Sequence, residues 1–310
     1  MMKKYFLYLI LPLLVLIIIS TKDVKKIELT IPTSITDLGY SNDDIERLVY
    51  YYTTDVLDII EEYQIPSYFT KACLKYKNCH GMSLGKYYEK ARGSTHNLLY
   101  TINTINRPNL LEVKNTKSKA ILPDTKLILV NKNYYLERDF TPKNLTKISV
   151  IPHIIRPNEE MLADLEAFKH YLNLYQKAKD RGLSLVVYSA YRTYEKQEIL
   201  YYSINNQDDN YVARPGFSEH HTGLAFDIST LEVGLTERFE MTPEFTFLKN
   251  NAHTEGFILR YPKGKEGITG YFYEPWHFRY VGKKAAFTIY YEGLTLEEYL
   301  ARYIEIPPID

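Results

Sequence analysis

Two short segments of the chain contain residue types that can bind one metal ion and activate water. The first, residues 218–227, reads SEHHTGLAFD, and the second, residues 274–277, reads EPWH. A catalytic zinc ion usually takes three protein ligands and leaves a fourth position open for water. Zinc lowers the pKa of that water to near neutrality, and a carboxylate nearby can accept its proton. The candidate ligands are His220, Asp227 and His277, and the candidate base is Glu274.

Local sequence patterns predict the elements that must position these side chains. The segment LAFDIS alternates between large apolar and smaller or polar residues, so the carboxylate of Asp227 would point away from the core of a strand. Gly223 precedes this strand where the chain must turn, and a residue without Cβ suits that turn. Residues 276–281 (WHFRYV) are aromatic and β-prone, which predicts a second strand with His277 and Arg279 on one face.

Residue types and spacing alone leave other roles open. A lone histidine is more often a surface or core residue than a metal ligand, and a lone Glu-x-x-His is equally weak. The helical zinc-peptidase signature has two histidines four apart with a glutamate next to the first, and this sequence does not contain it. On chemistry alone, a metal site and a purely structural role therefore remain alternatives.

Four segments together resemble the motifs of one enzyme family. Residues 216–227 (GFSEHHTGLAFD) and 267–282 (GITGYFYEPWHFRYVG) resemble two signatures of the VanY-type D-alanyl-D-alanine carboxypeptidases. These enzymes are zinc peptidases of bacterial cell-wall peptidoglycan. Residues 189–192 (SAYR), with Gln197 five residues later, resemble a third signature, and residues 129–140 (LVNKNYYLERDF) resemble the usual entry into that domain. The four motifs occur in the order that the family shows.

The resemblance implies a role for each candidate at the metal. His220, Asp227 and His277 would bind zinc, while Glu274 would act first as general base and then as general acid. His221 stands where relatives often have glutamine, and we assign it a packing or surface role. The only tryptophan, next to His277, would be a core residue or a pocket wall.

The resemblance also implies which residues hold the substrate. Arg192 would face the substrate carboxylate or the developing oxyanion, and Ser218 and Gln197 would help to hold the C-terminal end of the substrate. A planar guanidinium matches a carboxylate with two parallel hydrogen bonds, which agrees with this role for Arg192. Without the motif, a surface ion pair, a turn serine and a solvated glutamine would be the simpler interpretations.

The order of expected helices and strands predicts an α+β fold. Strands and helices do not alternate as βαβ units, so we expect helices around a small, mainly antiparallel sheet that carries the zinc site. The predicted regions are residues 1–23, a signal or membrane anchor; 24–125, a mostly helical region of unknown role; and 126–305, the catalytic domain. Helices are predicted over residues 45–60, 85–105, 162 to near Gly182, 193–205 and 243–255, and a strand over 183–189. Ser41, with Asp44 three residues later, resembles the N-cap of the first of these helices.

The first residues of the sequence are typical of a secretory signal or a short membrane anchor. Lys3 and Lys4 precede an apolar run from Tyr5 to Ile19. The run is shorter than the ~20 residues of a comfortable membrane span. Pro12 interrupts it, and no Ala-x-Ala cleavage site follows. We expect an uncleaved anchor with the catalytic domain outside the cytoplasm, and a cleaved signal with secretion is the alternative.

Composition restricts the partners and leaves the cysteine chemistry open. Lysine plus arginine and aspartate plus glutamate each number 38, so the formal net charge is zero. A neutral chain gives no argument for a nucleic-acid partner. Cys73 and Cys79 lie outside the candidate site, and either one disulfide or two buried thiols would fit an exported protein.

Three functions remain after the sequence is read in this way. The first is a zinc carboxypeptidase that removes the terminal D-alanine of peptidoglycan stem peptides. The second is a related wall peptidase, namely an L,D-carboxypeptidase, a dipeptidase or an endopeptidase, which would use the same metal and base. The third is a catalytically silent wall-binding module, and the intact Glu274 argues against it because a binding module needs no base.

Overall fold

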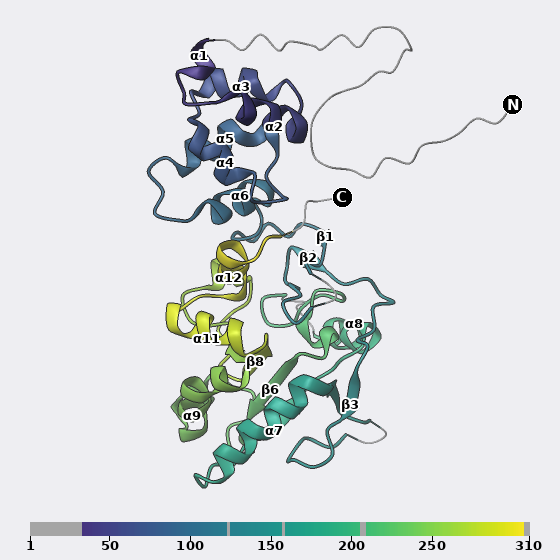
Figure 1. Cartoon of the computed structure of the whole chain (residues 1–310). Coiled ribbons are helices and arrows are strands. Elements are labelled where there is room, and N and C mark those ends of the chain that lie inside the picture. The colour runs from purple at the N-terminus through teal and green to yellow at the C-terminus, as the bar shows by residue number, and fades with distance from the viewer. Residues whose placement is uncertain (1–32, 123–124, 157–158, 205–208, 307–310) are drawn as a thin grey trace, which may run out of the picture. The chain divides into compact units, whose positions relative to one another are not determined.

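The computed structural model describes residues 33–122, 125–156, 159–204 and 209–306 (Figure 1). Contacts within the chain divide it into one unit that ends at Ile102 and a second that begins at Asn103. The predicted anchor, residues 1–23, lies outside the described residues. Among the helices that the structure does describe, none has both the length and the apolar character needed to cross a bilayer.

The second unit begins earlier in the chain than the predicted boundary between residues 125 and 126. The side-chain amide of Asn103 donates to the carbonyl oxygens of Leu300, Ala301 and Ile304, at 3.4, 3.1 and 2.8 Å. These contacts join two segments far apart in the sequence, which a reading of local patterns does not reveal. The described residues from 103 to 122 therefore belong to the same unit as the catalytic site.

The first unit is helical, as predicted for most of its length. Its elements are α1 (Thr33–Thr36), α2 (Asn42–Tyr52), α3 (Val56–Tyr63), α4 (Ser67–Cys73), η1 (Gly81–Ser83) and α5 (Leu84–Ala91), and α6 (Leu98–Asn106) crosses the division. Ser41 and Asp44 form the expected capping box at the start of α2. Thr53, with φ of 76°, ends α2, so the single helix predicted over residues 45–60 is two helices.

Two further expectations for this unit are resolved by the structure. The helix predicted over residues 85–105 is likewise two helices, because the chain leaves helical geometry after Ala91 and returns to it only at Leu98. Cys73 and Cys79 are both buried free thiols, which is the second of the two alternatives left open by the sequence.

The second unit has the predicted α+β fold with a small antiparallel sheet. Its main sheet has the strand order β5 (Val186–Ser189), β6 (Ala225–Ser229), β8 (His277–Tyr280) and β7 (Phe257–Leu259), with every neighbouring pair antiparallel. Two smaller pairs are β1 (Ser118–Lys119) with β2 (Tyr134–Tyr135), which is parallel, and β3 (Leu145–Lys147) with β4 (Leu162–Asp164), which is antiparallel.

Helices surround this sheet in the second unit (Figure 1). They are α7 (Leu165–Lys179), α8 (Tyr194–Ser203), α9 (Pro243–Asn251), α10 (Glu266–Thr269), α11 (Lys283–Glu292) and α12 (Leu296–Tyr303), with the 3₁₀ helices η2 (Glu219–Thr222), η3 (Glu237–Met241) and η4 (Ala252–Glu255). The predicted helix over residues 193–205 corresponds to α8, and that over residues 243–255 corresponds to α9 followed by η4.

Helix α7 covers one face of the main sheet. Its N-cap is Asp164, whose carboxylate accepts hydrogen bonds from the backbone N–H groups of Glu166 and Ala167, both at 3.0 Å. The helix therefore begins three residues later than predicted from Leu162, which lies in β4. Tyr171 of α7 stacks on Phe226 of β6 with ring centroids 5.4 Å apart, and this contact leaves the opposite face of β6 for other groups.

The register of the strands places the candidate ligands side by side. Phe226 pairs with Phe278 on neighbouring strands, and Asp227 pairs with His277. Successive side chains of a strand point to opposite faces, so the two phenylalanines face the core with α7 while Asp227 and His277 share the other face. The alternation predicted from the sequence is confirmed. On the neighbouring strand β5, Ser189 is the register partner of Asp227.

Candidate metal centre and active site

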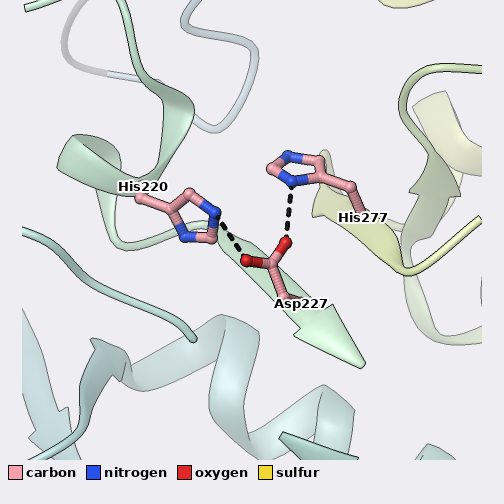
Figure 2. A group of neighbouring side chains, drawn as sticks. All are labelled: His220, Asp227 and His277. Atoms are coloured by element: carbon pink, nitrogen blue, oxygen red, sulfur yellow. Dashed lines mark hydrogen bonds and ion pairs between the residues drawn. The ribbon is translucent and has the colours of Figure 1, made fainter. Parts of the chain in front are cut away.

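The structure brings the three predicted ligands together in one buried group (Figure 2). One potential ligand atom from each of His220, Asp227 and His277 lies within 4.8 Å of the others. The two carboxylate oxygens of Asp227 face different rings: Oδ2 is 3.2 Å from Nε2 of His220, and Oδ1 is 3.0 Å from Nδ1 of His277. All three side chains therefore converge on one point beside Asp227.

A tight turn between η2 and β6 makes this convergence possible. Gly223 ends η2 in the left-handed conformation, with φ of 72°, as the sequence suggested. A Cβ atom at this position would lie 3.0 Å from a methyl carbon of Leu145 and 3.2 Å from the backbone nitrogen of Asp164. The turn is therefore open to glycine alone without rearrangement, and it joins His220 to the strand that carries Asp227.

The ring of His220 is fixed by a backbone contact on its far side. Its Nδ1 atom lies 2.6 Å from the carbonyl oxygen of Ala190, so this nitrogen carries the proton and donates it. The other nitrogen, Nε2, is then unprotonated and directed to Asp227. An unprotonated imidazole nitrogen is what a metal ligand requires.

Burial and charge act in opposite directions on these ligands. Burial alone would raise the pKa of Asp227, but the two neighbouring imidazoles outweigh it and hold the pKa well below its ordinary value. Burial lowers the pKa of His220. Burial also opposes the charging of His277, yet the nearby carboxylates of Asp227 and Glu219 raise its pKa to about 9. The group is thus an anionic carboxylate that attracts positive charge to the site.

The donor set fits zinc. Two imidazoles and one carboxylate are the protein ligands of many catalytic zinc sites, which keep a fourth position for water. Nε2 of His277 is buried without a hydrogen-bond partner among the described residues, while its Nδ1 faces the other ligands. A cation bound by His220, Asp227 and His277 would replace the proton that Nδ1 of His277 shares with Asp227.

Glu274 lies beside the ligand group and is largely shielded from solvent. Its Oε2 atom is 3.6 Å from Nδ1 of His277, and its side chain is 13% exposed. Burial, reinforced by the charge of Asp227, raises the pKa of Glu274 to about 8. A carboxyl group whose pKa lies near neutrality can both accept and return a proton, which is the property required of a general acid–base residue.

Arg192 is held in place by two neighbours. Its Nη1 donates to Oε1 of Gln197 at 2.8 Å, and its Nη2 donates to Oγ of Ser189 at 2.9 Å. The amide nitrogen of Gln197 in turn donates to the carbonyl oxygen of Ala213 at 2.6 Å. The oxygen and the nitrogen of the Gln197 side-chain amide therefore both have protein partners. This arrangement suits a residue that supports Arg192 better than one that contacts the substrate itself.

One cavity of about 210 Å³ joins the metal group to the other candidates. Its walls include all seven residues singled out from the sequence: Arg192, Gln197, Ser218, His220, Asp227, Glu274 and His277. Trp276 also lines the cavity, which agrees with its predicted place as a pocket wall. His221, which follows the candidate ligand His220 in the sequence, is buried against the rings of Phe140 and Tyr194 instead.

The sequence did not single out several residues that shape this site. Tyr261 and Tyr271 line the cavity, and the ring centroids of Tyr261 and His277 are 4.8 Å apart. Glu219, the residue before the candidate ligand His220, lies on the core side of the site, with its Oε2 atom 3.6 Å from Nε2 of His277. Arg279 was expected on the same face as His277, and a buried arginine requires a carboxylate, but the spacing does not identify which residue supplies it.

Known proteins are similar to this chain over the region that contains the candidate site. The family model described as VanY, D-alanyl-D-alanine carboxypeptidase, matches residues 160–283. The putative carboxypeptidase YodJ of Bacillus subtilis (strain 168) is 42% identical over 195 residues, which cover 59% of this chain and 70% of that protein. The D-alanyl-D-alanine carboxypeptidase of Enterococcus faecium is 30% identical over 196 residues, which cover 60% of this chain and 62% of that protein.

A solved structure is similar over the same region. The structure of the LdcB LD-carboxypeptidase matches with a TM-score of 0.54 and 40% identity, and it covers 58% of this chain and 87% of that chain. Together with the metal group, these matches define the enzyme class as a zinc metallopeptidase. The chain belongs to the VanY family of D-alanyl-D-alanine carboxypeptidases.

Proposed function

We propose that this chain is a zinc carboxypeptidase that removes the terminal D-alanine from peptidoglycan stem peptides ending in D-alanyl-D-alanine. The observation that carries the proposal is the meeting of three functions in one cavity: a ligand group for zinc, a carboxyl group with a raised pKa, and a supported arginine. The family match and the Enterococcus faecium relative support the same substrate class.

Three residues of the cavity would hold the metal. His220 would use Nε2, His277 would use Nδ1, and Asp227 would use a carboxylate oxygen, which are the atoms that already face one another. When bound, zinc supplies Lewis-acid chemistry and makes water a usable nucleophile near neutral pH. The remaining steps of hydrolysis belong to side chains of this protein.

Glu274 would move the proton. In its ionised form it accepts a proton from the attacking water, and it then delivers that proton to the nitrogen of the departing D-alanine as the peptide bond breaks. The burial that raises its pKa makes the protonated intermediate state accessible, and delivery of the proton to the departing nitrogen returns the carboxylate to its ionised form.

Arg192 would bind the free carboxylate at the C-terminus of the substrate. Ser189 and Gln197 fix its guanidinium from two sides, so little side-chain entropy remains to be lost when the carboxylate arrives. Ser218 lines the same cavity and is 95% buried, so its hydroxyl can donate to the same end of the substrate. Recognition of a free carboxylate distinguishes a carboxypeptidase from an endopeptidase.

An L,D-carboxypeptidase is the second candidate function. It would use the same metal group and base on a tetrapeptide whose terminal D-alanine follows an L-centre. The similarity to the LdcB LD-carboxypeptidase structure, at 40% identity, favours it over the dipeptidase and endopeptidase alternatives. The two carboxypeptidases would differ in the walls of the cavity and share its catalytic residues.

One experiment separates these possibilities. The zinc-loaded full chain is incubated with free pentapeptide, tetrapeptide and cross-linked muropeptides, and the products are identified by mass. Loss of one alanine from the pentapeptide alone supports the proposed function, and loss from the tetrapeptide alone supports the L,D-activity. Cleavage of cross-links without release of free alanine contradicts both, and no cleavage of any substrate supports a silent binding module.

We further propose that residues 1–23 hold the enzyme at the cell membrane with the second unit outside the cytoplasm. The proposal is supported by the lysines at positions 3 and 4 before the apolar run, and by a substrate that lies outside the cell. Protease added to cells without their wall should then digest the catalytic unit. Protection from protease contradicts the proposal, and a mature chain that starts near Ser20 indicates a cleaved signal and secretion.

A further inference from the structure

The two ring nitrogens of His277 face different parts of the protein (Figure 2). Nδ1 lies on the cavity side, 3.0 Å from Asp227 and 3.6 Å from Glu274. Nε2 lies on the far side of the ring, 3.6 Å from Oε2 of Glu219. Nε2 of His277 and Oε2 of Glu219 are both buried, and neither atom has a hydrogen-bond partner among the described residues. A buried donor site and a buried acceptor therefore face each other at slightly more than hydrogen-bond length.

Glu219 cannot turn away from His277 because arginines hold its other oxygen. Oε1 of Glu219 accepts from Nε of Arg260 and from Nη1 of Arg279, both at 2.7 Å. The side chains of all three residues are 0% exposed. Two charge-assisted hydrogen bonds to one oxygen fix the plane of the carboxylate, and Oε2 is left directed at the histidine.

A second carboxylate completes this buried cluster without contacting the metal site. Nη1 and Nη2 of Arg260 donate to the two oxygens of Glu297, at 3.0 and 2.7 Å. Nη2 of Arg279 donates to the carbonyl oxygens of Lys126 and Ile128, at 3.0 and 2.8 Å. Every guanidinium therefore has partners, so the cluster is complete apart from the single oxygen that faces His277.

The chemistry of a metal ligand explains that free oxygen. If Nδ1 of His277 binds zinc, the proton of the neutral imidazole must sit on Nε2. Ligating histidines usually donate this second N–H to a carboxylate or a carbonyl, which sets the tautomer and the ring orientation and raises the basicity of the ligand. The second N–H of His220 donates to the carbonyl oxygen of Ala190. The group in the corresponding position beside His277 is the carboxylate of Glu219.

We propose that Glu219 is a positioning residue for the metal site: it accepts a hydrogen bond from Nε2–H of His277 and thereby presents Nδ1 to zinc. The proposal rests on the proposed zinc enzyme and adds a residue that does not touch substrate or metal. It assigns a role to the residue before the ligand His220, whose carboxylate otherwise serves only to neutralise two arginines.

A matched pair of substitutions separates positioning from simple charge balance. Glu219→Gln and Glu297→Gln each remove one carboxylate from the same buried cluster, and both contact Arg260. Of the two carboxylates, only that of Glu219 faces His277. Zinc dissociation constants are measured by competition with a chromophoric chelator on the full chain, without substrate, and unfolding of the metal-free proteins is measured alongside.

We expect Glu219→Gln to weaken zinc binding by about 10- to 100-fold, because that is the usual effect of losing such a partner. Glu297→Gln should change the zinc dissociation constant by less than about threefold. It should lower the unfolding temperature about as much as Glu219→Gln does. Glu219→Asp keeps the charge but is too short to reach both the arginines and His277, so its zinc binding should also be weakened. Equal losses in the Glu219 and Glu297 variants, or no loss at Glu219, overturn the proposal.

A spectroscopic signature of the unmodified protein covers the case in which the variants do not fold. Nitrogen-15 spectra of the zinc-loaded chain should show two ligand histidines of opposite tautomer. His220 should be protonated at Nδ1 and bind through Nε2, and His277 should be protonated at Nε2 and bind through Nδ1. If both bind through Nε2, Glu219 has no proton to accept and the proposal is wrong. Failure of the carboxypeptidase assay would affect neither measurement.

Discussion

The two sides of His277 place the same residue type in opposite environments. On the cavity side, burial raises the pKa of Glu274 to about 8, and the charge of Asp227 adds to the effect. On the core side, burial also acts to raise the pKa of Glu219, but Arg260 and Arg279 outweigh it and hold the pKa well below its ordinary value. The protein thus makes one glutamate able to exchange a proton and the other permanently anionic.

This difference shows how a fold divides work between carboxylates. A general base must have a pKa near the working pH, so it needs burial with only partial compensation. A residue that accepts a hydrogen bond from a metal ligand must stay ionised, so it needs full compensation. The arginines at positions 260 and 279 supply that compensation to Glu219. At Glu274, the charges of His277 and Arg192 offset only part of the effect of burial.

The largest effect should follow from removing a ligand between these two sides. His220→Ala, Asp227→Ala and His277→Ala should each abolish tight zinc binding and lower activity on the order of 10³-fold or more, because water loses its activation. Metal content measured by elemental mass spectrometry checks the prediction. His221→Ala is the control, since His221 is equally buried but lies outside the ligand group, and it should keep its zinc. Full occupancy in all three ligand variants would refute the assignment.

The next effect tests the cavity side alone. Glu274→Gln should retain zinc and the fold but lower kcat by about 10²- to 10⁴-fold, which is the usual contribution of a positioned acid–base group. Zinc content and kcat are measured on the same preparation. Loss of zinc would make Glu274 a ligand, and an unchanged kcat would place proton transfer on another residue.

A smaller effect is expected at the substrate end of the cavity. Arg192→Ala should reduce kcat/KM by about 10- to 100-fold, because a charge-assisted hydrogen bond contributes roughly 1.5–3 kcal/mol. Lysine at this position should rescue activity only in part, since it lacks the two-pronged geometry. Gln197→Ala should cost less, because Ser189 still holds the guanidinium.

The matched substrate for this prediction is a peptide with an amidated C-terminus. The wild-type enzyme should cleave it much more slowly than the free acid, and Arg192→Ala should show little difference between the two. Equal rates of wild type on both peptides would contradict the role of Arg192 in carboxylate recognition and would favour an endopeptidase.

Much of the cavity side could be predicted from the sequence because its signals are local. The three candidate ligands and Glu274 lie in two short segments, and the alternation around Asp227 correctly indicated which way its side chain points. Gly223 marked the turn that delivers His220 to the same place. The mainly antiparallel α+β fold followed from the order of strands and helices.

The core side could not be predicted because its contacts join distant parts of the chain. Glu219, Arg260, Arg279 and Glu297 come from four separate segments of the chain, and nothing in the spacing pairs one with another. The same limitation explains the early start of the second unit, where Asn103 binds carbonyl groups around residue 300. Two helices were also joined in error, because helical spacing of apolar residues continues across the left-handed Thr53.

The smallest expected effect concerns a third carboxylate, Glu255, which pairs with two exposed lysines, whereas the arginine partners of Glu219 are fully buried. Lys177, Lys283 and His170 surround it at 2.5, 3.1 and 3.1 Å. Burial acts to raise its pKa, but hydrogen bonds from these partners outweigh burial and lower the pKa to about 2. A carboxyl group with a lowered pKa stabilises the fold above its unfolded pKa of about 4.3, and this stability is lost as the pH falls towards 2.

Glu255→Gln should therefore lower the free energy of unfolding at pH 7 by about 1–2 kcal/mol, a figure reduced for the exposed lysines. The difference from wild type should shrink as the pH falls from about 4.5 to 2, and denaturant unfolding across this range measures it. Glu240→Gln, which breaks one exposed pair with Lys263, is the control and should change stability less. A loss that stays constant with pH would mean that Glu255 acts through packing, and zinc affinity should be unchanged in either case because this cluster does not contact His277.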